Sequence, residues 1–381
     1  MTIRKTGVFQ PHLLAAAVAL GVATQAGAVD FELGEIQGKF DSTLSIGGSW
    51  STRNPDKNFI SNNSGTGVVG KGSARVIDDG RQNFRAGENF STVFKGIHDL
   101  ELKYGDSGAF VRGKYWYDFE QKDGSQHFYD ISDQGRDQAA SASGGQILDA
   151  FIYHNYTVAD LPGNVRLGKQ VVSWGESTFI PNGINAINPL DASAFNRPGV
   201  ELKEGQLPVE MLSFSYDLAD TLSLEGFYQY NFRPSVLDGC GTFFSVSDNT
   251  QEGCRNNKII VNPAGNLTTD QAIRARAYET RGATDWPSDG GQYGLALRKT
   301  LEALNDAELG IYYANYHSRT PLANGTVRTT LGPGTLPSGT YNTVYPENIR
   351  LFGVSLNGVV GTTAVFSELS YRPNQPLSFN A

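Results

Sequence analysis

The chain of 381 residues carries 39 acidic and 31 basic side chains, which gives a formal net charge of −8. This acidic balance argues against a nucleic-acid partner, because phosphate binding needs a basic surface. The chain contains 44 glycines, 17 Tyr and 21 Phe residues, and its mean hydropathy is −0.32. This composition fits a soluble all-β protein or a membrane β-barrel, in which alternate strand residues are apolar.

The first residues have the pattern of an export signal. A basic pair near the start is followed by the apolar run Leu13–Ala23 and by the small-residue cleavage site Ala26-Gly27-Ala28. We therefore expect a signal peptide over residues 1–28 and a mature chain that begins near Val29. The apolar run is too short to cross a membrane as a helix, so we expect an exported protein without helical spans.

Strand-like segments follow one another through the mature chain. The clearest is Gly108–Gln121, where Val111 and Tyr115 alternate with Arg112 and Lys114. A period of two places one face of a strand in an apolar environment and the other in water. Eleven strands are predicted, at Lys39–Ser51, Phe90–Tyr104, Gly108–Gln121, Ile147–Thr157, Asn164–Ser173, Val209–Tyr216, Thr221–Phe232, Gln292–Thr300, Glu308–His317, Ile349–Leu356 and Thr362–Tyr371.

The connections between these strands alternate in length. Long ones are predicted at 52–89, 122–146, 174–208, 233–291 and 318–348, and short ones at 105–107, 158–163, 217–220, 301–307 and 357–361. This alternation is typical of a transmembrane antiparallel β-barrel of the outer-membrane type, and a soluble sandwich gives no reason for it. We therefore predict that residues 29–381 form such a barrel in the outer membrane of a Gram-negative bacterium, with the short turns in the periplasm.

The predicted number of strands is odd, whereas single-chain bacterial barrels close with an even number. An open edge in lipid would leave backbone N–H and C=O groups without partners. We therefore expect an incomplete barrel: either the sequence is truncated at its C-terminus or strands of a larger barrel are missing. A longer reading frame would support this expectation.

The connection 174–208 is the strongest candidate for a functional segment. Asn188 followed by Pro189 predicts the start of a short helix within it. A long loop that folds inward narrows a barrel, and its side chains then set selectivity. The constriction candidates are polar, charged and aromatic side chains on this loop and on the strand before it: Arg166, Gln170, Trp174, Glu176, Asn188, Arg197, Glu201, Lys203 and Glu204.

Two interpretations of these charges stay open and are compatible. Mixed charges in a water-filled pore create a transverse field that orients a dipolar solute. Alternatively, the charges pair with one another and hold the loop in place. Trp174 fits a packing or membrane-interface aromatic better than a platform for a ligand.

Cys240 and Cys254 are the only cysteines, and both lie in the connection 233–291. A disulfide is expected between them, because an exported chain meets an oxidising compartment. Metal binding is not favoured, since no His or carboxylate lies beside them at ligand spacing.

The sequence offers no catalytic pattern. Four histidines follow the signal peptide, His98, His127, His154 and His317, and nothing local pairs any of them with a serine and an acid. GxSxG and HExxH do not occur, and neither of the nucleotide-binding glycine motifs, GxxxxGK[ST] and GxGxxG, follows a predicted parallel strand. We therefore predict that the protein is not an enzyme and uses no cofactor or metal.

Four motifs lie close together in and before the central loop: GKQVVSWGE at 168–176, FIP at 179–181, GINAINP at 183–189 and RPGVELKE at 197–204. With Phe84–Glu120, they resemble the family catalogued as domain of unknown function 1302 over most of the mature chain. The resemblance implies an exported outer-membrane barrel, longer than this chain, that transports lipid-like or other hydrophobic compounds. It assigns a role to no residue.

These patterns predict an outer-membrane β-barrel that passes or binds a small hydrophobic or amphipathic solute. A general polar-solute porin is one alternative, which the charged face of Gly108–Gln121 would suit. A surface structural or adhesion protein is another, because the loops 233–291 and 318–348 are long and polar. The expected partners are outer-membrane lipid, the barrel-assembly machinery and periplasmic or inner-membrane transport components, with no nucleic acid.

Overall fold

The computed structural model describes residues 24–62, 69–72, 78–175, 183–254, 258–260, 269–327 and 339–377. Most of the expected signal peptide lies outside the described residues. Among those that are described, 12 strands form one large antiparallel sheet and four form a small second sheet. No helix in this part of the chain is long and apolar enough to cross a membrane.

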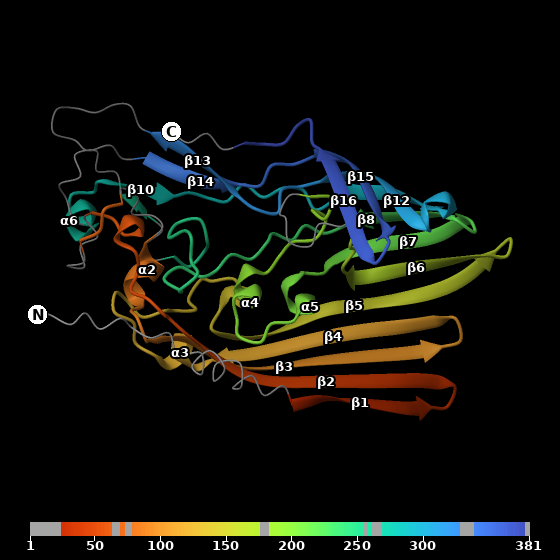
Figure 1. The fold of residues 1–381 in the computed structure, drawn as a ribbon. Helices are drawn as coiled ribbons and strands as arrows, with labels where there is room; N and C mark the ends of the chain where they lie inside the picture. Colours follow the sequence, from red (N-terminus) through yellow and green to blue (C-terminus); the bar gives the residue numbers. More distant parts are fainter. Residues whose placement is uncertain are drawn as a thin grey trace, which may run out of the picture.

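The strands of the large sheet pair with one another in chain order, and β1 and β16 form its two edges. Figure 1 shows the curved sheet, with the helices α4 (Ala192–Phe195) and α5 (Leu202–Gly205) beside it. Its strands are β1 (Thr24–Leu33), β2 (Ile36–Trp50), β3 (Asn89–Tyr104), β4 (Ser107–Asp118), β5 (Ser143–Val158), β6 (Leu161–Gln170), β7 (Val209–Ala219), β8 (Leu222–Gln229), β11 (Gln292–Leu301), β12 (Ala307–Tyr316), β15 (Ile349–Val360) and β16 (Thr363–Tyr371).

All 11 strands expected from the alternation are present, with bounds that differ by a few residues. The count of eleven is wrong, because β1 adds a twelfth strand to the sheet. β1 was missed because its residues were interpreted as the end of an export signal. It pairs with β2 across a two-residue turn in which Gly34 has a φ of 65°, a conformation that glycine adopts without strain.

The alternation of short and long connections is present in the structure. Figure 1 shows the short turns at one end of the sheet and the longer connections, with their helices, at the other. The short turns span 34–35, 105–106, 159–160, 220–221, 302–306 and 361–362, where 302–306 includes the 3-10 helix η4 (Glu302–Leu304). The long connections span 51–88, 119–142, 171–208, 230–291 and 317–348.

The last two long connections, predicted at 233–291 and 318–348, also carry short strands that the sequence did not predict. They form the small sheet, in the order β13-β14-β10-β9, and β10 pairs in parallel with β14. Such pairing between distant segments leaves no local signal in a short polar strand. The elements are β9 (Lys258–Ile260), α6 (Thr269–Arg274), β10 (Tyr278–Arg281), β13 (Leu322–Val327) and β14 (Gly339–Val344).

The earlier connections carry short helices. β4 ends three residues before the predicted Gln121, because the Asp118 carboxylate accepts hydrogen bonds from the backbone N–H groups of Glu120 and Gln121 and caps a helix there. These helices are η1 (Lys57–Phe59), α2 (Asp79–Asn83), α3 (Phe119–Asp123) and η2 (Gln138–Ala140).

The two faces of the large sheet differ in an unusual way. On β4, Val111 and Tyr115 are each 39% exposed, whereas Lys114 and Asp118 are 4% and 1% exposed. We call the face with Lys114 the enclosed face and the opposite one the outer face. The outer face exposes further large apolar side chains: Ile46, Ile152, Leu167, Leu212, Leu295, Ile311, Phe352 and Val354. The enclosed face buries polar ones: Lys95, Asp149, Gln170, Ser213, Gln229, Gln292 and Ser355.

The expected disulfide between Cys240 and Cys254 is present, with the two Cα atoms 5.4 Å apart. It lies in the connection between β8 and β11. The Arg136 guanidinium donates a hydrogen bond of 2.6 Å to the Cys240 carbonyl, so the bridge is attached to the connection between β4 and β5. The disulfide thus helps to join two of the long connections.

We expect loss of this bridge to destabilise the protein. Replacing both cysteines by serine should lower the free energy of unfolding by about 3 kcal/mol. The bridge joins residues that are 14 positions apart in the sequence, and so restricts the unfolded chain. Urea unfolding of the protein in detergent micelles measures the change. Wild-type protein treated with a reductant should unfold like the double variant, and equal stability of all three forms would contradict the prediction.

Candidate functional site

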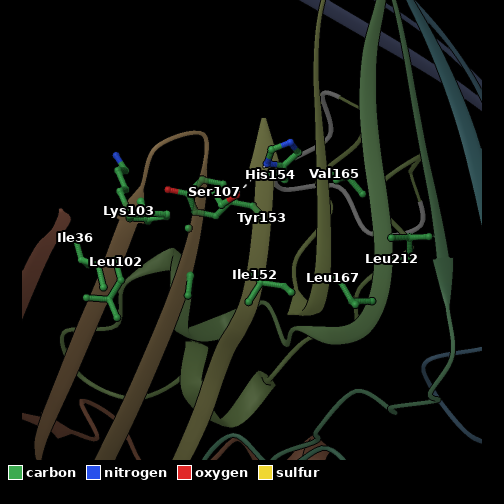
Figure 2. A pocket seen from close by; sticks show the side chains of 13 residues that line it. Ile36, Leu102, Lys103, Ser107, Ile152, Tyr153, His154, Val165, Leu167 and Leu212 are labelled. Carbon is green, nitrogen blue, oxygen red and sulfur yellow. Dashed lines mark hydrogen bonds between the residues drawn. The ribbon is translucent and has the colours of Figure 1, made fainter. Parts of the chain in front are cut away.

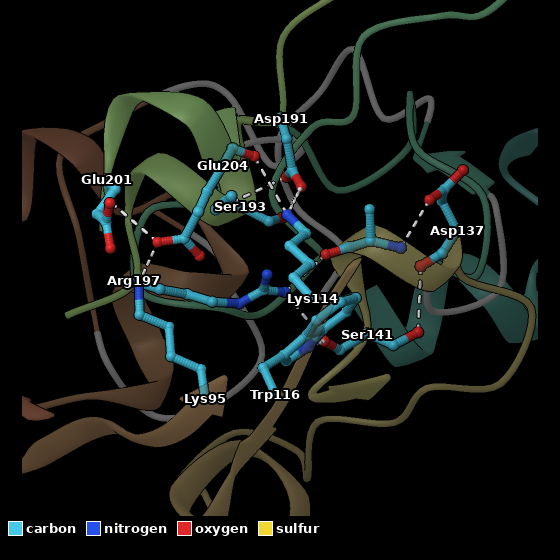
Figure 3. Close-up of polar contacts among 12 residues, drawn as sticks. Lys95, Lys114, Trp116, Asp137, Ser141, Asp191, Ser193, Arg197, Glu201 and Glu204 are labelled. Atoms are coloured by element: carbon cyan, nitrogen blue, oxygen red, sulfur yellow. Dashed lines mark hydrogen bonds and ion pairs between the residues drawn. The ribbon is translucent and has the colours of Figure 1, made fainter. Parts of the chain in front are cut away.

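Residues 183–208 lie against the enclosed face of the large sheet and contact it on two sides. Charged contacts join them to β3 and β4 (Figure 3). The Lys95 ammonium on β3 pairs with Glu204 of α5, and the Lys114 ammonium on β4 lies 3.2 Å from the Asp191 carboxylate. Lys114 also donates a hydrogen bond of 3.2 Å to the Glu204 carbonyl. Both lysines are almost completely buried.

Apolar contacts join the other side of the segment to the strands that follow it. Trp174 and Ile184 are each 1% exposed. Together with Ile187 they form one buried cluster with the enclosed faces of β7, β8, β11, β12 and β15. The strand residues in this cluster are Val209, Met211, Phe227, Ala296, Tyr312, Ala314, Tyr316, Ile349 and Leu351. The segment is therefore held by ion pairs on one side and by hydrophobic packing on the other.

The short helix of this segment does not begin where the sequence predicted it. α4 starts at Ala192 and is capped by Asp191, whose carboxylate accepts a hydrogen bond of 2.9 Å from the Ala194 N–H. The Asn188 side chain bonds instead to both backbone groups of Val172, at 2.6 and 3.3 Å. The prediction of a cap at Asn188 is thus wrong, because a tertiary contact uses its amide.

A second short helix, α5, was not predicted. Its N-terminus has a capping box in which the Glu201 N–H donates a hydrogen bond of 2.9 Å to the Glu204 carboxylate. The spacing of the two glutamates could have revealed it. Glu204 therefore serves two purposes, since the same carboxylate also pairs with Lys95.

Four of the nine constriction candidates are buried and satisfied by the protein itself, so they offer no surface to a solute. Asn188 and Glu204 bond as described above. Gln170 accepts a hydrogen bond of 2.8 Å from the Ser213 hydroxyl and donates one to the Met211 carbonyl. The Trp174 indole donates one of 2.8 Å to the Glu225 carboxylate. These four side chains bond within the protein, as in the second of the two interpretations left open above.

Arg197 belongs to the segment 183–208, and its half-buried side chain lies against Trp116 of β4. Its guanidinium lies 4.4 Å from the centre of the Trp116 ring and donates hydrogen bonds to the carbonyls of Ala139 and Ser141. Burial lowers the pKa of Arg197, an effect that the Asp191 carboxylate opposes. Glu176, another candidate, lies outside the described residues.

Glu201 and Lys203 belong to a second charged network that the sequence reasoning missed in part. The Lys203 ammonium lies 3.1 Å from Glu201 and 3.9 Å from Asp99. Arg112 bonds to Asp99 at 2.8 Å and to Asp149 at 3.1 Å. Opposite charges at facing positions of β3 and β4 are a signal that could have identified the Asp99 and Arg112 pair.

Arg166, the ninth candidate, lies apart from this segment, in a groove of about 480 Å³ near the short turns. Its guanidinium is 5.5 Å from the Phe151 ring, and the Phe110 and Phe151 rings lie 5.5 Å apart. Arg166 donates a hydrogen bond of 3.0 Å to Asn164, and no ion pair with a carboxylate is found for it within the described part of the chain. The groove thus combines aromatic surface with an unpaired cation.

The outer face has a different character. A groove of about 580 Å³ there is lined mainly by apolar side chains of β2 to β7 (Figure 2). Leu102, Ile152 and Leu167 line it, with Ser107 and His154 hydrogen-bonded to each other at 2.9 Å beside them. Among the described residues that line this groove, Lys103 is the single lysine, and arginine and carboxylate side chains are absent.

Comparisons with known proteins give one match. A family model described as "Protein of unknown function (DUF1302)" matches residues 10–381, which is nearly the whole chain. No curated protein and no solved structure matches the chain. The resemblance that the central motifs suggested is therefore confirmed.

Proposed function

The chain belongs to the family of proteins of unknown function DUF1302, and we propose that it forms an outer-membrane β-barrel that passes or binds a small amphipathic solute. The observation that carries the proposal is the distribution of side chains over the large sheet. Apolar side chains are exposed along its outer face and charged ones are buried on its enclosed face. Lipid favours such an outer face, whereas in water a contiguous apolar surface of this size would promote aggregation.

In the proposed barrel, every strand edge in lipid needs a partner. The edges β1 and β16 would therefore pair with each other or with further strands. Cleavage near Val29 would leave only the last residues of β1, next to the turn at 34–35, and so place the mature N-terminus close to the short turns. That end would face the periplasm, and the small sheet and the disulfide would lie outside the cell.

Residues 183–208 would narrow this barrel. Their contacts with β3 and β4 on one side and with β7 to β15 on the other run across the enclosed space. Two charged residues of the segment, Glu201 and Lys203, remain partly exposed. They could then contact a passing solute. The buried ion pairs would hold the constriction rigid.

The groove around Arg166 suggests the class of solute. The neighbouring Phe110 and Phe151 rings suit an apolar body, and the unpaired guanidinium suits a carboxylate or another anionic group. We infer an organic anion with an apolar part. The alternative of a general polar-solute porin is favoured by the partly exposed charged residues of the enclosed face, such as Glu101 and Arg112.

Flux through the reconstituted protein tests the proposal. Proteoliposomes should take up an aromatic or alkyl carboxylate faster than a sugar of similar size, and Arg166→Gln should reduce carboxylate uptake severalfold while leaving sugar uptake unchanged. Arg85→Gln, at an exposed position in the connection before β3, is the matched control. Rapid size-limited uptake of sugars and carboxylates alike would favour the porin, and a protein that does not insert into membranes would refute the barrel.

A further inference from the structure

Three carboxylates meet away from the proposed constriction. Asp78 and Asp79 lie at the start of α2, and Asp248 lies in the connection between β8 and β11. One oxygen atom of each residue lies within 4.8 Å of the other two. Asp78 is 2% exposed and Asp248 8% exposed, so water stabilises these charges poorly.

The hydrogen bonds of the cluster leave one buried acceptor unused. Asp248 Oδ2 accepts hydrogen bonds from the N–H groups of Asp78 and Asp79, at 2.9 and 3.2 Å. The second oxygen of the same carboxylate, Oδ1, is buried and has no hydrogen-bond partner among the residues that the structure describes. A buried carboxylate oxygen without a donor is unfavourable unless a cation or a proton satisfies it.

We propose that Asp78, Asp79 and Asp248 bind a calcium ion. Ca²⁺ takes carboxylate and carbonyl oxygens at about 2.3–2.6 Å, so two ligands on opposite sides of the ion are separated by about 5 Å. The spacing of the three carboxylates fits this limit. Backbone carbonyls and water would complete the flexible coordination that calcium accepts.

The position of the cluster gives the ion a structural role. Asp78 accepts a hydrogen bond of 2.8 Å from the Ser61 N–H, and Asp79 accepts one of 2.9 Å from the Tyr129 hydroxyl. The cluster therefore joins the connection between β2 and β3 to those between β4 and β5 and between β8 and β11. A bound ion would lock these three connections together at one end of the sheet, whatever passes through the protein.

A proton on Asp248 is the competing way to satisfy its unpartnered carboxylate oxygen. Burial raises the pKa of Asp248 to about 8, and the neighbouring Asp79 charge acts in the same direction. Since this folded-state pKa lies above the unfolded value, its contribution to stability is full below pH 4 and is lost as the pH rises towards 8. Without calcium, the melting temperature should therefore fall over that interval. Calcium should restore it at pH 8, where the carboxylates are ionised.

Terbium luminescence tests binding directly. Tb³⁺ prefers the same oxygen ligands, and the Tyr129 ring is close enough to sensitise its emission. Titrating Tb³⁺ into the full chain in detergent micelles at pH 8 should give a saturable signal that Ca²⁺ displaces. Asp248→Asn, which keeps an acceptor for the α2 N–H groups, should lose the signal, whereas Asp106→Asn, in a short turn, should keep it.

Thermal unfolding provides the second readout. Calcium at about 10 mM should raise the melting temperature of the wild type by several degrees, and that of Asp248→Asn by much less. If calcium neither displaces terbium nor shifts the wild-type melting temperature, the proposal is wrong. A pH-dependent melting temperature that calcium leaves unchanged would also overturn it and assign the neutralising role to a proton.

Discussion

Replacing Lys114 by methionine should cause one of the two largest losses of stability in this protein. The Asp191 side chain is completely buried and lies 3.2 Å from the Lys114 ammonium. Removing the lysine leaves a buried carboxylate without its charge partner, which costs about 3–5 kcal/mol. Under the barrel proposal, residues 183–208 also detach from β4, so solute flux should rise. Unfolding in detergent micelles and proteoliposome uptake measure the two effects.

Two further variants identify the cause. Lys203→Met breaks a partly exposed pair with Glu201 and should change stability by less than about 1 kcal/mol. Asp191→Asn keeps the cap of α4, so the double variant Lys114→Met/Asp191→Asn should regain much of the loss. If the double variant is as unstable as Lys114→Met alone, the uncompensated charge is not the cause.

Replacing Trp174 by alanine should cause the other large loss. The side chain is 1% exposed and its ring centre lies 5.0 Å from that of Phe227 and 5.9 Å from that of Tyr312. A buried tryptophan truncated in this way leaves a cavity, and such changes cost about 3–5 kcal/mol. The Glu225 carboxylate loses its indole donor as well. The free energy of unfolding from urea titration gives the magnitude.

A conservative variant and a surface variant serve as controls. Trp174→Phe retains most of the packing and should cost far less than the alanine variant. Trp286→Ala, at a residue that is 52% exposed, should have a small effect, because its ring packs mainly on Tyr345. Equal losses for Trp174→Ala and Trp286→Ala would show that the cluster around Trp174 does not hold the segment.

Both predictions concern the attachment of residues 183–208 to the large sheet. Residues 183–208 are polar where they meet β3 and β4 and apolar where they meet β7 to β15, and each side is anchored by buried side chains. The two losses should be nearly additive, because the described contacts of Lys114 and of Trp174 have no partner in common.

The sequence by itself determined 11 of the 12 strands of the large sheet and the alternation of their connections. The period of two in β4, where Val111 and Tyr115 alternate with Arg112 and Lys114, is a local property that neighbouring residues encode. The disulfide was also predictable, because two cysteines in a chain that is expected to be exported have one pairing. The central segment was recognised from its motifs, although the roles of most of its side chains were not.

Only the tertiary structure decided what those side chains contact. Asn188 bonds to Val172 instead of capping a helix, and Glu204 pairs with a lysine more than 100 residues earlier. β10, in the connection between β8 and β11, pairs with β14, in the connection between β12 and β15. The three aspartates around Asp248 likewise come from two distant segments. Such contacts depend on how the sheet curves and brings its long connections together. No pattern within one stretch of sequence encodes them.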